Sequence, residues 1–197
     1  MRTPAQILAK TQTALPPLGN VSFGDGFDAS HPEAAKALAA VERIAAEIAA
    51  AWPPRWLSML GKPGVGKTML AKRLAAWLRP RQPMQVLWTW SSVCQYLANG
   101  DWNILNQLRS QPVLILDDIT QGYSWPLSAH DNKTFRALGA LLDDRIGKWT
   151  VLTDNRRCGE IAEKDARVAS RMGRHGSVIV EITTCPDFWA KKRRETQ

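Results

Sequence analysis

Short apolar runs alternate along the chain with longer segments in which apolar residues recur every three or four positions. The runs predict five strands, at residues 56–60, 85–90, 113–116, 150–153 and 178–182. The periodic segments predict helices at residues 34–51, 69–78, 93–97, 102–109, 132–146 and 166–172. Because strands and helices alternate, we predict an α/β domain with a parallel five-stranded sheet sandwiched between helices, and ligands at the carboxyl ends of the strands.

Two of these helices are preceded by residues that commonly cap a helix. Ser30 and Glu33 have the spacing of a capping box ahead of the alanine-rich helix at residues 34–51. Ser91 or Ser92 is expected to cap the helix after the second strand, because a serine hydroxyl can accept a hydrogen bond from the first helical turn.

A glycine-rich sequence joins the first predicted strand to the next helix. Residues 61–68 read Gly-Lys-Pro-Gly-Val-Gly-Lys-Thr, the pattern of a phosphate-binding loop. Its glycines let successive backbone N–H groups converge on phosphates, Lys67 brings a positive charge, and Thr68 offers a hydroxyl to Mg²⁺. The alternative is a glycine-rich turn that only caps a helix. The residues expected to contact the nucleotide are Gly61, Lys62, Pro63, Gly64, Val65, Gly66, Lys67, Thr68 and Met69.

Length and composition indicate one domain. The 197 residues, 45% hydrophobic and 22% charged, suffice for one core around a sheet. No apolar stretch approaches the roughly 20 residues that span a bilayer, and residues 1–20 lack the apolar core of a secretory signal. We therefore expect a cytoplasmic protein with no membrane partner. Three separated cysteines, Cys94, Cys158 and Cys185, argue against a disulfide framework or a zinc site.

The chain is basic, with a net charge of +8 and a pI near 9.8, which fits a polyanionic partner without identifying it. Lys191 to Arg194 could touch nucleic-acid phosphates, or could be a solvated tail. Most of the nine tryptophans fall in predicted elements and are expected to pack in the core. Trp102 and Trp125 lie in less regular stretches and are the better candidates for stacking on bases.

Polar side chains follow two of the apolar runs. Asp117 and Asp118 end the run that begins at Val113, which is how a buried strand presents carboxylates to a metal and to a water molecule. Asn155 follows the fourth predicted strand, where its amide could meet a γ-phosphate. Each feature taken alone is also compatible with an ordinary turn at the end of a strand.

Arg167 and Arg171 are four residues apart in the helix predicted at 166–172, so they share one face of it. Such a pair suits the nucleotide of a neighbouring subunit, because a guanidinium binds phosphate through two parallel hydrogen bonds. Two solvated arginines are the alternative.

In this order, these features resemble the AAA+ ATPases, and within them the DnaC-type helicase loaders and the IstB-type transposition ATPases. The resemblance covers residues 21–187 and includes Phe23 and Phe27 ahead of the alanine-rich helix. It implies a P-loop NTPase fold with no substantial C-terminal lid domain. We expect a short, flexible N-terminal extension at residues 1–20 and a basic tail at residues 188–197.

The resemblance also implies roles for the candidate residues, with ATP and Mg²⁺ as cofactors. Lys67 and Thr68 would bind the phosphates and the metal, and Asp117 would also bind Mg²⁺. Asp118 would activate water, and Asn155 would sense the γ-phosphate. The finger residue would be Arg171, with Arg167 as the alternate, acting across a subunit interface of an oligomer, so a lone subunit should hydrolyse ATP slowly.

The chain differs from the family pattern at several points. Asp118 stands where AAA+ proteins usually have glutamate, which suggests modest turnover. Residues 187–190 read Asp-Phe-Trp-Ala where relatives often place an arginine, so a second sensor is not expected. Residues 91–109 resemble the helical insertion that touches single-stranded DNA in relatives, with Arg109 as the only basic residue. Contact between this segment and DNA would therefore depend on stacking with the bases or on other surfaces of the subunit.

The sequence therefore predicts an ATPase of the helicase-loader type, acting in DNA replication with single-stranded DNA and a replicative helicase. An IstB-like regulator on duplex DNA with a transposase would use the same nucleotide residues. A small-molecule kinase with a phosphate loop would need an acceptor-binding lid rather than the arginine pair. A GTPase is disfavoured, because no guanine-reading Asn-Lys-x-Asp segment occurs. A module that binds nucleotide without hydrolysing it remains open.

Overall fold

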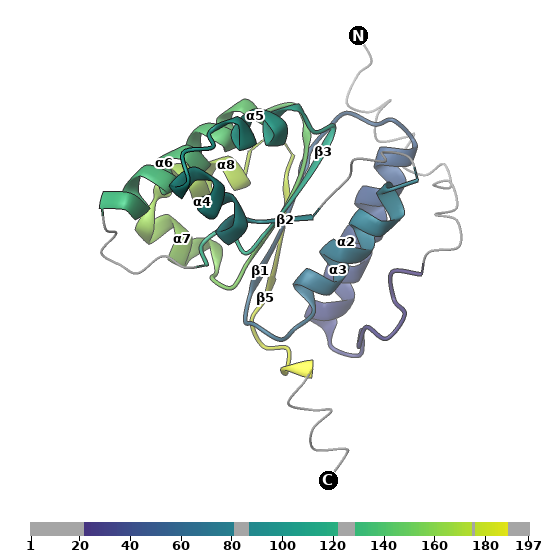
Figure 1. The fold of residues 1–197 in the computed structure, drawn as a ribbon. Coiled ribbons are helices and arrows are strands. Elements are labelled where there is room, and N and C mark those ends of the chain that lie inside the picture. The colour runs from purple at the N-terminus through teal and green to yellow at the C-terminus, as the bar shows by residue number, and fades with distance from the viewer. Residues whose placement is uncertain (1–21, 81–86, 122–128, 175, 189–197) are drawn as a thin grey trace.

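The structure is a computed structural model that describes residues 22–80, 87–121, 129–174 and 176–188 (Figure 1). The expected N-terminal extension, the basic residues of the expected C-terminal tail and the stacking candidate Trp125 lie outside these ranges.

Five parallel strands form one sheet in the order β2-β3-β4-β1-β5. Their bounds are β1 Trp56–Gly61, β2 Leu87–Thr89, β3 Val113–Asp117, β4 Trp149–Asp154 and β5 Val178–Ile182. This confirms the predicted five-stranded parallel sheet. The second strand is shorter than predicted, because residue 90 already belongs to the following helix and residues 85–86 are outside the described ranges.

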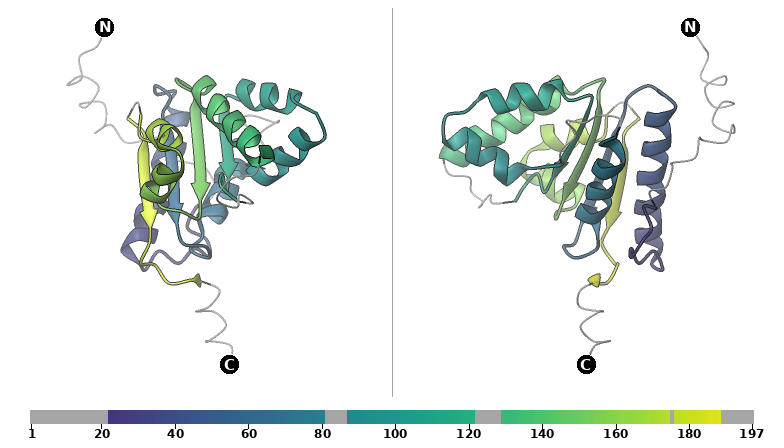
Figure 2. Two further views of the ribbon diagram at one scale, coloured as in Figure 1. Left: turned by 90° about the vertical axis from the view of Figure 1, so that its left-hand side faces the viewer. Right: turned by 45° about the vertical axis from the view of Figure 1, so that its right-hand side comes forward.

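Helices cover both faces of this sheet (Figures 1 and 2). One face carries α2 (Pro32–Ala49) and α3 (Lys67–Leu78). The other carries α4 (Trp90–Ala98), α5 (Asn103–Ser110), α6 (Ala129–Asp144), α7 (Cys158–Lys164) and α8 (Ala166–Met172). The sequence did not predict α7, because this seven-residue helix buries only Ile161 and so has no apolar periodicity.

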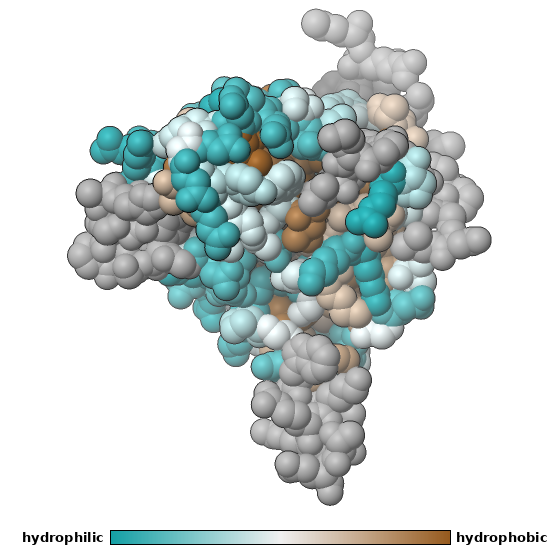
Figure 3. All heavy atoms as spheres, in the orientation of Figure 1, coloured by the Kyte–Doolittle hydropathy of each residue, from teal (hydrophilic) through white to brown (hydrophobic). Residues whose placement is uncertain are grey.

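The alternation of side chains along each strand divides the core into two layers. In β1, Leu57 and Met59 pack with α2 and α3, whereas Trp56 and Leu60 pack with the helices of the opposite face. Burial on both faces explains why β1, β3 and β4 are fully buried and read as continuous apolar runs. On the side seen in Figure 3 the surface is mainly hydrophilic, with small hydrophobic areas between polar side chains.

Two predicted helix caps are wrong. His31 caps α2, and its side chain accepts from the Glu33 N–H. The Glu33 carboxylate is engaged elsewhere, accepting from the N–H groups of Thr183 and Thr184 at 2.7 and 2.8 Å, so it cannot close a capping box with Ser30. At the start of α4, Thr89 is the cap and accepts from the Ser92 N–H at 3.2 Å, because the helix begins at Trp90, three residues earlier than expected.

Among the described residues, no helix combines the length and apolar character needed to cross a membrane.

Candidate functional site

The glycine-rich loop connects β1 to α3 and takes a conformation that requires glycine. Gly64 and Gly66 have φ values of 79° and 92°, in the left-handed region. A Cβ on Gly66 would lie 2.5 Å from the ring of Phe27, and one on Gly64 would lie 2.5 Å from the Asp187 carboxyl. Conformation and space therefore both exclude a side chain at these positions.

A cavity of about 1100 Å³ opens beside this loop. The segment before α2 contributes Phe27 and His31 to its wall, and the segment after β5 contributes Phe188. This volume is sufficient for a cofactor or nucleotide. Of the residues predicted from sequence, those in its lining are Pro63, Gly64, Val65, Gly66, Lys67, Thr68, Met69 and Asn155.

Lys67 lines the cavity and is almost fully buried. It donates to the carbonyls of Gly61 and Lys62 at 2.8 and 2.6 Å, and to Asn155 Oδ1 at 3.0 Å. Burial lowers the pKa of Lys67, while the carboxylates of Asp118, Asp154 and Asp117 oppose that shift. The predicted residues Gly61 and Lys62 thus contribute carbonyl oxygens that hold the lysine.

Asp117 and Thr68 come together beside the loop. Thr68 Oγ1 donates to the Asp117 carboxylate at 3.0 and 3.1 Å, and the buried hydroxyl of Thr153 donates to Asp117 Oδ1. A carboxylate and a hydroxyl are the oxygen donors that Mg²⁺ takes in phosphate-transfer sites. The donor set therefore fits the predicted metal.

Asp118 has a left-handed backbone conformation, with φ of 57°. Its N–H donates to Thr153 Oγ1 at 3.0 Å, and its carboxylate accepts from Asn155 Nδ2 at 3.0 and 3.1 Å. Burial, followed by the charges of Asp154 and Asp117, raises the pKa of Asp118 to about 6. Asn155 therefore connects Asp118 to Lys67.

The sequence analysis gave a role to Asn155 but none to the two polar residues before it in β4, Thr153 and Asp154, which support this arrangement. Thr153 bridges Asp117 and Asp118, as described above. Asp154 is fully buried and accepts from the N–H and hydroxyl of Thr120 and from the Arg156 N–H. The available signal was the run of polar residues at the carboxyl end of β4, which lies beside β3 in parallel register.

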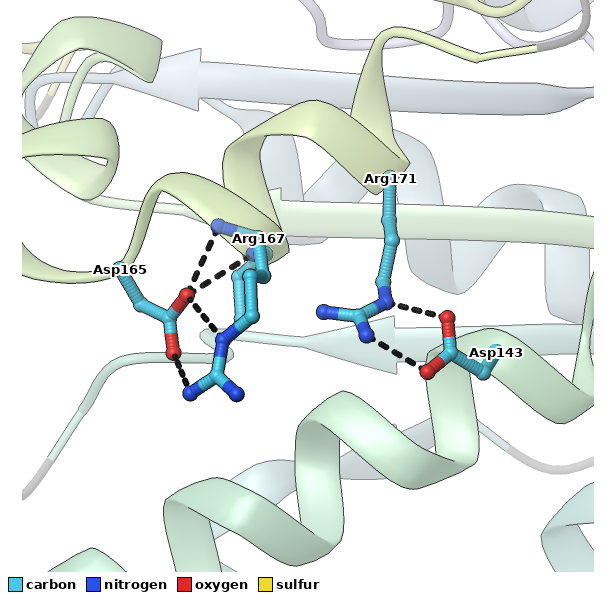
Figure 4. Close-up of polar contacts among 5 residues, drawn as sticks. Asp143, Asp165, Arg167 and Arg171 are labelled. Carbon is cyan, nitrogen blue, oxygen red and sulfur yellow. Dashed lines mark hydrogen bonds and ion pairs between the residues drawn. The ribbon is translucent and has the colours of Figure 1, made fainter.

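Arg167 and Arg171 lie outside the lining of this cavity. Both point from α8 over α6, and each pairs with an aspartate of its own chain (Figure 4). Arg171 binds Asp143 of α6 at 2.5 Å, and Arg167 binds Asp165 at 3.2 Å. Neither arginine therefore contributes to the lining of the cavity beside the glycine-rich loop.

A second hollow lies between α5 and α6, with a volume of about 870 Å³. The ring of Trp102 is 38% exposed there, and Lys133 Nζ lies 4.6 Å from its centroid. Arg109 and Arg136 also line the hollow. It is called the α5/α6 groove below.

Comparison with known proteins identifies the fold. A family model described as magnesium chelatase, subunit ChlI, matches residues 38–106, about a third of the chain. No curated protein matches the sequence.

Several solved structures share the fold at low sequence identity. The DnaC helicase loader is 19% identical, with a TM-score of 0.62 over 84% of this chain and 98% of its own. DnaA from Aquifex aeolicus bound to AMPPCP is 18% identical, with a TM-score of 0.61 over 84% of this chain and 51% of its own. DnaA bound to AMPPCP and single-stranded DNA is 16% identical, with a TM-score of 0.60, and 90% of this chain covers 54% of it. The chain thus spans about half the length of these DnaA chains.

Proposed function

Starting from the AAA+ ATPase fold that the chain shares with DnaC and DnaA, we propose that it binds and hydrolyses ATP with Mg²⁺. It acts in the cytoplasm as a helicase-loader-like factor of DNA replication, and it assembles on single-stranded DNA with ATP between subunits. The observation that carries the proposal is the cavity beside the glycine-rich loop. There, Lys67 lies next to the Thr68–Asp117 pair and the Asn155–Asp118 pair.

The loop binds the triphosphate through its backbone N–H groups and the Lys67 ammonium. In the structure the three N–H donors of this ammonium are taken by oxygen atoms, the carbonyls of Gly61 and Lys62 and the side-chain amide of Asn155. A phosphate oxygen therefore binds Lys67 by replacing one of these acceptors. Phe27 and Phe188 add apolar surface to the cavity, which suits a nucleobase.

Thr68 and Asp117 would hold Mg²⁺, which would supply positive charge to neutralise the phosphates. Asp118 accepts the proton of the attacking water. Burial and the charges of Asp154 and Asp117 raise the pKa of Asp118, which makes its carboxylate a stronger base than a free aspartate. Asn155 holds the Asp118 carboxylate through its Nδ2 atom.

The position of the arginines favours an active site completed by a second subunit. Arg167 and Arg171 do not line the cavity of their own chain, so they reach a nucleotide only in another copy. An arginine finger contributes about 10³–10⁵ in rate in P-loop enzymes. A lone chain should therefore turn over slowly.

The α5/α6 groove supports single-stranded nucleic acid as the surface on which the chain assembles. Single strands are held by aromatic faces that stack on bases and by cations that follow the phosphates. Trp102 offers such a face, and α6 contributes the cations Lys133 and Arg136 that the segment at residues 91–109 lacks. The groove therefore combines both requirements.

The ATPase rate tests this proposal. We expect the specific activity to rise with protein concentration and again with single-stranded DNA, because both bring subunits together. Lys67→Ala should lose ATP binding and turnover. A specific activity independent of concentration would contradict the interfacial site, and unchanged ATP binding by Lys67→Ala would contradict the cavity assignment.

The groove is tested with Trp102→Ala. Loss of one stacked base costs about 1–3 kcal/mol, so affinity for single-stranded DNA should fall about 5- to 150-fold. Tyr96→Ala, which removes an exposed aromatic ring of α4 outside the groove, is the matched control and should bind normally. If both variants lost the same affinity for single-stranded DNA, or if Trp102→Ala lost none, the α5/α6 groove would not be the DNA-binding surface.

The two alternative functions predict that other additions stimulate ATP turnover. An IstB-like regulator should respond to duplex DNA more strongly than to single strands. A small-molecule kinase should consume ATP only with a phosphate acceptor, and its rate should not depend on Arg171, since this arginine lies outside the cavity.

A further inference from the structure

The guanidinium of Arg171 is fixed in place by contacts within its own chain. Its side chain is 14% exposed, whereas that of Arg167, one turn earlier on α8, is 73% exposed. Both nitrogens of one edge are bound to Asp143, Nε to Oδ1 and Nη2 to Oδ2, each at 2.5 Å. This hydrogen bonding fixes both the position of the guanidinium and the plane in which it lies.

The contact with Asp143 uses only one of the two edges through which a guanidinium binds an oxyanion. The edge made by Nε and Nη2 faces Asp143, and Nη1 points away from that carboxylate toward Arg167 (Figure 4). Because guanidinium groups bind phosphate through two parallel N–H donors, the edge that carries Nη1 can take a second oxyanion while Asp143 stays in place.

The surface of α6 leaves room for this arrangement. A Cβ on Gly139, one turn before Asp143, would lie 3.7 Å from Arg171 Nη1, so the guanidinium extends along the helix over a residue without a side chain. The positive charges of Arg167 and Arg174 help to lower the pKa of Asp143, and the negative charge of Asp165 helps to raise the pKa of Arg171. In this cluster Arg167, Arg171 and Arg174 outnumber Asp143 and Asp165, and this excess of positive charge suits a phosphate.

We propose that Asp143 is a positioning residue: it holds Arg171 by one edge so that the other edge meets the ATP of a second copy of this chain. The inference rests on the proposed function, because Arg171 must act on a neighbour's nucleotide. Its physical basis is preorganisation, since the rotamer freedom of Arg171 is lost before the subunits meet. The opposite role, a latch that keeps Arg171 away from the partner, predicts the opposite result on removing Asp143.

The test compares assembly-dependent ATP turnover, without DNA, in the wild type, Asp143→Ala, Asp143→Glu and Arg171→Ala. We expect Asp143→Ala to lower turnover about 10- to 100-fold while ATP binding by the isolated chain stays unchanged, because misplaced catalytic groups lose rate rather than affinity. Asp143→Glu, which keeps a carboxylate for Arg171, should recover part of the rate. In the Arg171→Ala background, Asp143→Ala should have no further effect.

Asp144→Ala is the matched control, because Asp144 is the next residue of α6 and also pairs with an arginine, Arg109, at 2.6 Å. It should turn over ATP like the wild type. Faster turnover in Asp143→Ala would show a latch and overturn the proposal. An unchanged rate, or an equal loss in the Arg171→Ala background, would overturn it as well.

The proposed function fails separately from this inference. If the ATP turnover of the wild type does not depend on protein concentration, or if Arg171→Ala turns over ATP like the wild type, the proposed interfacial site itself is wrong. If turnover depends on both protein concentration and Arg171, but Asp143→Ala behaves like the wild type, only the proposed role of Asp143 is wrong. Thermal unfolding of each variant shows whether a lower rate of ATP turnover reflects loss of the fold.

Discussion

At the scale of single residues, Asp118 has a left-handed backbone conformation that aspartate adopts more readily than most other residues. Non-glycine residues rarely take positive φ, and aspartate and asparagine are among the few that do so often. With φ of 57°, the backbone turns after β3, and its N–H donates to Thr153 Oγ1. Strained backbone of this kind concentrates at functional sites. The conformation offers a physical reason for aspartate at a position where AAA+ ATPases, which the sequence resembles, usually have glutamate.

Thr153 holds both acidic residues through one hydroxyl, which donates to Asp117 and accepts from the Asp118 N–H. We predict that Thr153→Val lowers the free energy of unfolding by about 1–3 kcal/mol, because valine keeps the shape and leaves buried polar groups without partners. It should also raise the Mg²⁺ concentration needed for ATP binding, by freeing Asp117 to turn.

Urea unfolding and nucleotide titrations at several Mg²⁺ concentrations measure these two effects. Thr153→Ser keeps the hydroxyl and is the control. If valine and serine behave alike, the hydroxyl does not organise the site.

At the scale of elements, Glu33 joins the first turn of α2 to the segment after β5. Its carboxylate accepts from the N–H groups of Thr183, Thr184 and Cys185, which are about 150 residues away in sequence. Burial opposes ionisation, but these hydrogen bonds outweigh it and lower the pKa of Glu33 from 4.5 to about 2. The contact fixes the start of α2 against the edge of the cavity, since His31 and Cys185 both line it.

This contact predicts a pH dependence of stability. A lowered folded-state pKa means that the Glu33 contribution is fully present above pH 4.5 and is lost as the pH falls toward about 2. Glu33→Gln should therefore be less stable than the wild type at pH 7, and the difference should shrink between pH 4.5 and 2.

Urea unfolding of both chains across this range measures the difference. The wild type and Glu33→Gln share all other titrating groups, so those effects cancel in the comparison. A difference that stays constant with pH would show that Glu33 is not ionised in this contact.

At the scale of the whole molecule, the proposed site is divided between two surfaces. The cavity with Lys67 lies at the carboxyl ends of the strands, and the Asp143–Arg171 pair lies on α6 and α8 outside its lining. Because neither residue of this pair lines the cavity, the proposed site needs a second copy of the chain. Assembly is thus part of the proposed chemistry, and it supplies a direct test.

We predict that Lys67→Ala and Arg171→Ala, each inactive alone, recover activity when mixed. In a random 1:1 assembly, half of the nucleotide sites keep Lys67 and half of the neighbours keep Arg171, so about a quarter of interfaces are intact. The mixture should therefore show a fraction of wild-type turnover that grows with concentration. If the mixture stays as inactive as its components, the arginine does not act in trans.

The sequence by itself determined the glycine-rich loop, the five strands and the order of the chemical groups along the chain. These are local features: glycine at positive φ, apolar runs buried on both faces and polar residues where strands end. It placed Val178–Ile182 and Ala166–Met172 at their observed bounds. It did not find α7 or the caps of α2 and α4, where one or two hydrogen bonds decide between adjacent residues.

Only the tertiary structure decided which distant side chains meet. Thr153 reaches Asp117 because β3 and β4 are neighbours in parallel register, and Glu33 reaches Thr183 because α2 packs on β5. Arg171 meets Asp143 because α8 lies against α6, and Lys133 meets Trp102 because α6 lies beside α5. Such contacts depend on packing between elements, which no local pattern of residues encodes.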